Sequence, residues 1–279
     1  MTSYSGHVLD VETWPELRAP VLVLVLTGWV DAGGAGASAA QALAGQLGAG
    51  RVFARYDLSD LVDLQQTRPS VGLVDGETRL ISWPEIEFIA GRAGRDVVLC
   101  AGPEPSLRWP TITRDIVEVA QRLKVERAFA LGAMPAVVSH RRPTPVLATA
   151  TSHSLAQEAG VLRTDYSGPT GLQTVVQVAL GEVGIPAVGL WAQVPHYVSG
   201  NPSPPATRAL LSRLRELAGV EADLADLDEA CETYVEKVEE GLVDRPDVAE
   251  LVEAIESEHP PLPTADELAS EIERFLREQ

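Results

Sequence analysis

The feature that most constrains the fold is an unbroken apolar run that starts at Pro20 and continues as Val-Leu-Val-Leu-Val-Leu to Leu26. A strand with one face in water alternates apolar and polar residues, whereas this run has no polar face. The run therefore predicts a strand that is covered on both faces, as in the centre of a parallel sheet with helices on either side.

Strand-like and helix-like segments alternate over most of the chain. Residues 71–81 predict a β-hairpin with an Asp-Gly turn, and we expect this hairpin to make the sheet mixed. The whole pattern predicts a three-layer α/β/α sandwich with a mixed, mostly parallel sheet. The further expected strands are 51–55, 86–90, 97–101, 128–132, 146–150 and 185–194, and the expected helices are 36–47, 109–124, 152–159, 171–183 and 208–217.

Acidic residues are concentrated at the C-terminal end. The formal net charge is −18, of which residues 216–279 carry −17 and residues 1–215 only −1. Three stripes of apolar residues at helical spacing, within 227–242, 248–255 and 268–276, lie in this acidic region. We therefore expect an α/β/α domain over 1–218 and an acidic helical subdomain over 219–279. The stripes pack on the body or, alternatively, bind a partner.

The charge balance also bears on partners and location. An acidic tail repels nucleic acids and anionic membrane surfaces, so we expect neither as a partner. The two cysteines, Cys100 and Cys231, exclude a disulfide framework. The early apolar run is too short to span a bilayer and no export signal is visible, so the sequence predicts a cytoplasmic protein.

A glycine-rich turn follows the apolar run and is the first candidate site. It contains Gly28, Trp29, Asp31 and Gly33, and its backbone N–H groups could hold an anion at the start of the next helix. The residues after it fit a permissive dinucleotide-binding pattern, but the turn is long and Asp31 would repel a pyrophosphate. The alternative is that the glycines serve tight packing.

Other candidate residues follow later strands, and we expect them at the carboxyl edge of the sheet, where α/β proteins bind ligands. Asp31 and Asp165 are either paired carboxylates for acid–base chemistry or helix caps. The histidines are either cleft residues or hydrogen-bonded structural residues. The full set of candidate cleft residues is Gly28, Trp29, Asp31, Gly33, His140, His153, Asp165, Gly168, Gly171 and His196.

Common catalytic motifs are missing from the sequence. It contains no Gly-Lys-Ser/Thr of a P-loop, no Gly-x-Ser-x-Gly elbow and no Cys/His spacing typical of zinc. We therefore expect no metal site, no cofactor and no assigned catalytic residue.

Four segments together resemble a known family. They are Gly28-Trp-Val-Asp-Ala-Gly33, Gly168-Pro-Thr-Gly171, Gly189-Leu-Trp-Ala-Gln-Val-Pro-His-Tyr197 and Asn201-Pro-Ser-Pro-Pro205. In these segments the chain resembles the actinobacterial branch of the proteasome assembly chaperone 2 family. The resemblance implies a fold like that of purine nucleoside phosphorylases and related hydrolases, self-association (a trimer is the first guess) and, outside bacteria, a chaperone role in proteasome assembly.

Two functional hypotheses follow. The first is a non-enzymatic assembly chaperone or scaffold whose partners are copies of itself and proteasome subunits. The alternative is a nucleoside phosphorylase- or hydrolase-like enzyme, or a small-molecule binder, that uses a cleft at the carboxyl edge of the sheet.

Overall fold

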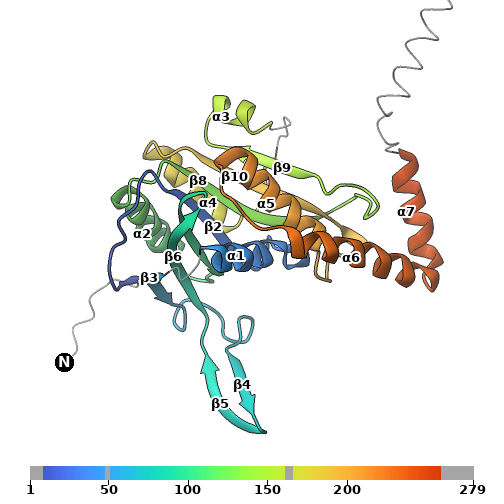
Figure 1. The fold of residues 1–279 in the computed structure, drawn as a ribbon, viewed down its shortest axis with the longest axis horizontal. Helices are drawn as coiled ribbons and strands as arrows, with labels where there is room; N and C mark the ends of the chain where they lie inside the picture. Colours follow the sequence, from blue (N-terminus) through green and yellow to red (C-terminus); the bar gives the residue numbers. More distant parts are fainter. Residues whose placement is uncertain (1–8, 48–50, 161–165, 259–279) are drawn as a thin grey trace, which may run out of the picture.

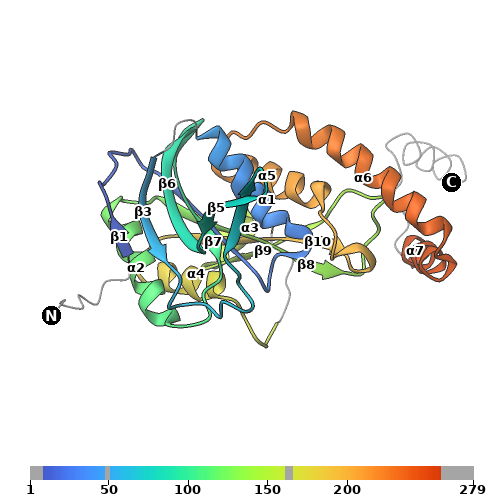
Figure 2. The same ribbon diagram turned by 90° about the horizontal axis from the view of Figure 1, so that it is seen from below.

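The computed structural model describes residues 9–47, 51–160 and 166–258. Eight strands of these residues form the main sheet, with helices on both of its faces (Figures 1 and 2). In spatial order the strands are β1 (Leu9–Val11), β3 (Arg51–Asp57), β6 (Glu85–Ala93), β7 (Arg95–Pro103), β2 (Val21–Thr27), β8 (Arg127–Ala136), β10 (Ala187–Pro195) and β9 (Val146–Ala150).

The centre of the sheet is parallel and its two sides are antiparallel. Strands β7, β2, β8 and β10 run in one direction, as the apolar run predicted. On one side of this centre β6 pairs antiparallel with β7, β3 with β6, and β1 with β3. On the other side β9 pairs antiparallel with β10. The predicted α/β fold with a mixed sheet is confirmed.

The predicted hairpin is present, but its expected role in the main sheet is wrong. Strands β4 (Ser70–Val74) and β5 (Glu77–Ser82) form a two-stranded sheet of their own. The main sheet is mixed because β6 and β7 are joined by a tight turn at Gly94, where φ is 75°, so that the two strands must run antiparallel. Strand β6 already pairs with β3 and β7 on its two edges.

Two pairs of helices cover the sheet. Helices α1 (Ala35–Gln46) and α5 (Pro204–Ala218) lie together on one face, and α2 (Trp109–Arg122) and α4 (Leu172–Glu182) lie together on the other. The short helix α3 (His153–Glu158) follows β9. Its N-terminal cap is Ser152, whose Oγ accepts a hydrogen bond from the backbone N–H of Leu155 at 3.3 Å.

Strand β2 explains why the apolar run is continuous. Its valines, at 21, 23 and 25, pack in the core beneath α1 and α5, whereas its leucines, at 22, 24 and 26, pack in the core beneath α2 and α4. All six side chains are at most 2% exposed. Successive side chains of a strand point to opposite faces, so a polar residue anywhere in the run would be buried in one of the two cores.

The acidic region continues beyond α5 as two long helices. Helix α6 (Ala225–Val243) packs along α5, and α7 (Pro246–Glu258) follows at the end of the body (Figures 1 and 2). They contain the first two predicted apolar stripes, of which Tyr234, Leu242, Val252 and Ile255 are buried. The third stripe, within 268–276, lies outside the described residues. No helix in the described ranges has the length and apolar character that a membrane crossing requires.

Candidate functional site

Asp31 lies at the carboxyl edge of the sheet and binds the start of helix α1. It follows β2, bridges to Ala133 of β8, and precedes the single 3₁₀ turn η1 (Ala32–Gly34). Its Oδ1 accepts a hydrogen bond from the backbone N–H of Gly36 at 2.7 Å, and its Oδ2 accepts one from Ala37 at 3.4 Å. Burial raises the pKa of Asp31, and the two backbone hydrogen bonds oppose that rise. The carboxylate therefore serves as a helix cap and occupies the N–H groups that an anion would need.

Gly33 joins this turn to the connector that precedes α5. Its N–H donates to the carbonyl of Ser199 at 2.9 Å, and its carbonyl accepts from the N–H of Ser203 at 3.0 Å. Its φ of 63° lies in the left-handed region, and a Cβ atom here would lie 2.7 Å from the Cβ of Ser203. A glycine is therefore required for packing. Trp29, in contrast, is 62% exposed.

A residue that the sequence analysis missed, Glu104, fills the neighbouring part of the edge. It follows β7, and its Oε1 accepts a hydrogen bond from the backbone N–H of Leu172, the first residue of α4, at 2.6 Å. Burial raises the pKa of Glu104, opposed by this hydrogen bond. A Cβ on Gly171 would lie 2.9 Å from Glu104 Oε1, and one on Gly28 would lie 3.7 Å from its Cβ. Gly171 thus makes room for a second acidic helix cap, whereas a side chain at Gly28 would be in ordinary contact with Glu104.

The Gly168 turn is closed by its own tyrosine. Tyr166 Oη donates a hydrogen bond to the carbonyl of Pro169 at 2.8 Å, and a Cβ on Gly168 would lie 2.6 Å from the same oxygen. Asp165 lies outside the described residues. Of the two carboxylates that were expected at one cleft, the structure therefore describes only Asp31, and the predicted pairing stays a prediction.

His140 is a buried structural histidine between the body and helix α6. Its backbone N–H donates to Tyr197 Oη at 3.0 Å, and its Nδ1 lies 2.8 Å from the same oxygen. Its Nε2 lies 3.1 Å from Oε1 of Glu239 on α6. A carboxylate only accepts, so Nε2 carries the proton and Nδ1 accepts from the Tyr197 hydroxyl. Burial lowers the pKa of His140, although the Glu239 carboxylate opposes this.

The other two candidate histidines lie at opposite edges of the sheet, with His196 directly after the carboxyl end of β10. His196, in the 3₁₀ turn η2 (His196–Val198), is exposed, and its Nδ1 donates to the carbonyl of Ala136 at 3.1 Å. The expected position of His153 at the carboxyl edge is wrong. Because β9 runs antiparallel to β10, its end pairs with Val188 near the start of β10, and the exposed His153 lies at the opposite edge.

Two arginines next to His140, also missed by the sequence analysis, hold the acidic helices on the body. Arg141 donates to both carboxylate oxygens of Glu239 on α6, at 2.6 and 3.2 Å, and to Glu253 on α7 at 2.6 Å. Arg142 donates to both oxygens of Glu256 on α7, at 3.0 and 2.7 Å, and to its carbonyl at 3.1 Å.

These ion pairs differ in strength. Glu253 is largely exposed, and an exposed pair contributes roughly 0–1 kcal/mol. Arg142 and Glu256 are each about one quarter exposed and form a bidentate pair, which is the stronger geometry. The hydrogen bond from Arg142 lowers the pKa of Glu256, and that from Arg141 lowers the pKa of Glu239. Arg142 is therefore the main polar anchor of α7.

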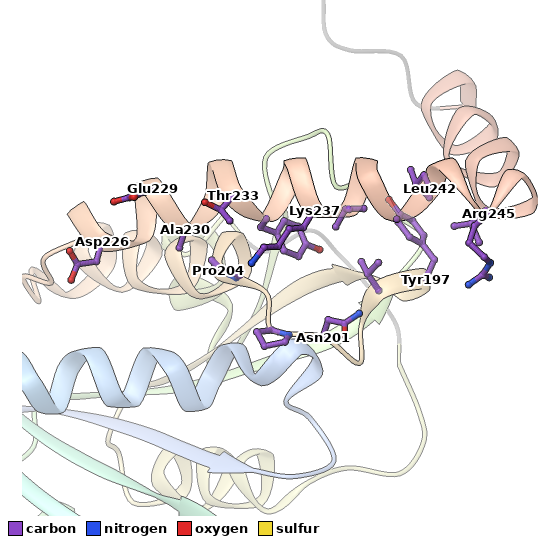
Figure 3. A pocket seen from close by; sticks show the side chains of 16 residues that line it. Tyr197, Asn201, Pro204, Asp226, Glu229, Ala230, Thr233, Lys237, Leu242 and Arg245 are labelled. Atoms are coloured by element: carbon purple, nitrogen blue, oxygen red, sulfur yellow. The ribbon is translucent and has the colours of Figure 1, made fainter.

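A groove of about 790 Å³ runs between α6 and the connector before α5. Lys237 extends from α6 toward this connector, and Tyr197 and Asn201 line the opposite wall (Figure 3). Val238 and Leu242 of α6 also line the groove. The groove is mainly apolar, and neither His140 nor Asp31 lines it.

The candidate polar residues that the structure describes thus act as helix caps and anchors. Asp31 and Glu104 cap helices, and His140 spans two elements through both ring nitrogens. Within the described ranges, no group of three or more His, Cys, Asp or Glu side chains is arranged to hold a metal ion.

A family model supplies the identification. The model of the PAC2 family matches residues 25–242, from within β2 to the end of α6. This chain belongs to the PAC2 family. The matched region contains the glycine-rich turn, Arg141 and Arg142, and the residues of α6 that line the groove. Helix α7 lies beyond the match.

Solved structures of PAC2 relatives agree with this membership. A proteasome-assembly chaperone homologue of Mycobacterium tuberculosis is 40% identical, with a TM-score of 0.75 over 83% of this chain and 99% of that chain. A PAC2 family protein of Streptomyces avermitilis is also 40% identical, with a TM-score of 0.76 over 84% and 99%. An archaeal proteasome activator of Pyrococcus furiosus, at 17% identity, a TM-score of 0.66 and coverage of 83% and 97%, shares the fold. No curated protein matches the sequence.

The lowered pKa of His140 predicts a loss of stability toward acid. Below the ordinary value of 6.5 the unfolded chain binds a proton that the folded chain does not, so the free energy of unfolding falls as pH falls from about 7 to 5. The slope is at most about 1.4 kcal/mol per pH unit for one proton.

Urea unfolding at several pH values measures this slope. His140→Gln should flatten the slope, while His153→Gln, at an exposed position, should leave it unchanged. An equal slope in all three proteins would contradict the assignment.

The Arg142 anchor predicts selective loosening of α7. Arg142→Ala removes a bidentate, charge-assisted pair, which contributes roughly 1.5–3 kcal/mol. Hydrogen exchange of residues 246–258 should therefore become at least about tenfold faster, with the main sheet unchanged. The matched control is Arg208→Ala, which removes a more exposed pair with Asp228 on α6. Unchanged protection of α7 in the Arg142 variant would show that apolar contacts alone hold this helix.

Proposed function

We propose that this chain is a non-enzymatic assembly chaperone or scaffold that binds proteasome subunits and associates with copies of itself in the cytoplasm. Membership of the PAC2 family and the similarity to the M. tuberculosis proteasome-assembly chaperone homologue support a protein-binding role. We further propose that residues 1–218 form an α/β/α domain and residues 219–279 an acidic helical subdomain.

One observation favours this proposal over an enzyme. In α/β proteins of this kind, ligands bind at helix N-termini along the carboxyl edge of the parallel strands. Here Asp31 occupies N–H groups at the start of α1, and Glu104 occupies the first N–H of α4. Both carboxylates would repel a phosphate. The edge that would serve catalysis is thus used to fix the helices.

The proposal predicts physical association with proteasome subunits. Affinity purification of the full-length protein from its own cells, followed by mass spectrometry, should recover proteasome subunits. The control is the same tag on an unrelated acidic protein, because a charge of −18 collects basic proteins nonspecifically. The purification is done in about 0.3–0.5 M salt, because charge attraction between exposed groups is strongly screened at that ionic strength. Enrichment of subunits over the control under these conditions supports specific binding. Their absence would contradict the proposal.

The competing hypothesis of a nucleoside phosphorylase- or hydrolase-like binder predicts a different result. A ligand present at 100 times its Kd stabilises a protein by about 2.7 kcal/mol. We expect no thermal shift with nucleosides, nucleotides or phosphate. We also expect Asp31→Ala to lower the free energy of unfolding by about 0.5–2 kcal/mol, as the loss of a helix cap does. A ligand shift that Asp31→Ala abolishes would instead establish a binding site at this turn.

A further inference from the structure

The groove between α6 and the connector before α5 contains a straight row of apolar side chains. Ala230, Tyr234, Val238 and Leu242 line it at intervals of four residues, so they follow one side of α6. Ala230 and Val238 are only half-buried, although they belong to an apolar row. A groove of about 790 Å³ with such a row is suited to the apolar face of a further helix, which is a common mode of peptide recognition.

The charged residues that line this groove are sorted along α6. Asp226 and Glu229 lie at its beginning, whereas Lys237 lies in its second half and Arg245 just after its end (Figure 3). Lys237 has no ion-pair partner among the described residues, and Arg245 pairs with the exposed Asp247. The groove is therefore acidic at one end and basic at the other, and it fits an occupant with the opposite order of charges.

The last residues of the sequence carry such a pattern. They lie outside the described residues, but Thr264-Ala-Asp-Glu267 is a capping box, which predicts the start of a helix. The third apolar stripe follows at helical spacing and consists of Leu268, Ile272, Phe275 and Leu276. Residues 264–273 carry four acidic residues and no basic residue, or −4, whereas 274–279 carry two arginines and one glutamate, or +1. An isolated helix this short is marginal in water, so its apolar face needs a surface that covers it.

We propose that residues 264–279 dock as a helix in the groove of the same molecule, antiparallel to α6. In this orientation the acidic part of the segment lies beside the basic end of the groove, and its arginines lie toward the acidic end. With Glu271 beside Lys237, Arg277 lies about 9 Å further along the helix axis. Glu229 lies about 12 Å from Lys237 in the same direction, within reach of an arginine side chain. A parallel orientation would bring like charges together at both ends.

The connection through α7 favours the same orientation. Helix α7 begins at Pro246, beside the basic end of the groove, and its 13 residues place Glu258 about 20 Å away. The sequence continues as His259-Pro-Pro-Leu-Pro263, and a proline-rich chain extends by about 3.1 Å per residue. Residues 259–266 therefore span roughly 25 Å, which is enough to return to the start of α7. The segment thus enters the groove at the basic end with its acidic part first.

This docking goes beyond the proposed function, because it involves only the chain itself. The short connection keeps the segment near the groove at an effective concentration on the order of millimolar. The docked segment covers the apolar row of α6, and a helix of another protein reaches that row only by displacing it.

Hydrogen exchange of the full-length protein, followed by mass spectrometry, tests the docking. Residues 266–278 should exchange at least about tenfold more slowly in the wild type than in Phe275→Asp, which interrupts the apolar stripe. Lys237→Glu should also speed their exchange, and Glu271→Lys combined with it should restore the protection. The matched control is Lys124→Glu, which changes the other lysine of the chain, exposed after α2, and should have no effect. Circular dichroism and thermal melting check that each variant is folded.

A fluorescently labelled peptide of residues 264–279 measures whether the groove is free. By fluorescence anisotropy, the peptide should bind the Phe275→Asp protein at least about tenfold more tightly than the wild type, because the wild-type segment competes from within the molecule. Lys237→Glu introduced into the Phe275→Asp protein should weaken this binding.

Three results would overturn the inference. Equal exchange of residues 266–278 in the wild type and in Phe275→Asp would show that the segment does not dock and would leave the groove to another partner. Equal effects of Lys237→Glu and Lys124→Glu, or no restoration by Glu271→Lys, would remove the groove as the site. Protection that rises with protein concentration would place the segment on a second copy. All three are independent of the affinity purification, which tests proteasome binding separately.

Discussion

The structure depends on the burial of strand β2 on both faces. Its six alternating valines and leucines belong to two separate cores, one under α1 and α5 and one under α2 and α4. Burial of one such side chain contributes roughly 1.5–3 kcal/mol, so this one strand links both helix layers to the sheet. The strand also fixes where the functional edge lies, because the glycine-rich turn, Asp31 and the start of α1 follow directly from its end.

The polar residues at the carboxyl edge of the sheet bind the N-termini of two helices. A helix N-terminus accepts either a ligand anion or a side-chain carboxylate, and the two compete for the same N–H groups. In this chain Asp31 and Glu104 take that place on α1 and α4, Gly171 leaves space for Glu104, and Gly33 leaves space for the connector. The surfaces left for function are the groove along α6, the acidic helices and the exposed β4–β5 hairpin.

Much of the fold could be predicted from the sequence, and much of the site could not. The run to Leu26, the hairpin and the helices have periodic local patterns, so they were found close to their true positions. The direction of β9 has no such pattern, and its antiparallel pairing with β10 puts His153 at the edge opposite to the predicted one. Glu104 binds α4, 68 residues away, and Arg142 binds α7, 114 residues away. Contacts between residues so distant in the sequence produce no local pattern of residue spacing, so one sequence alone does not predict them. Asp31 could be identified because its cap is local.

We propose that this PAC2 family member acts on proteasome subunits as a scaffold. The most direct measurement is the distribution of proteasome subunits between free subunits, half-assembled particles and complete particles, resolved by native gradient separation of extracts from cells with and without the gene. The account predicts that deletion shifts subunits from complete particles toward earlier species, and that Asp31→Ala, which affects only a helix cap, restores assembly when it is expressed in the deletion strain. An unchanged distribution after deletion would contradict the account.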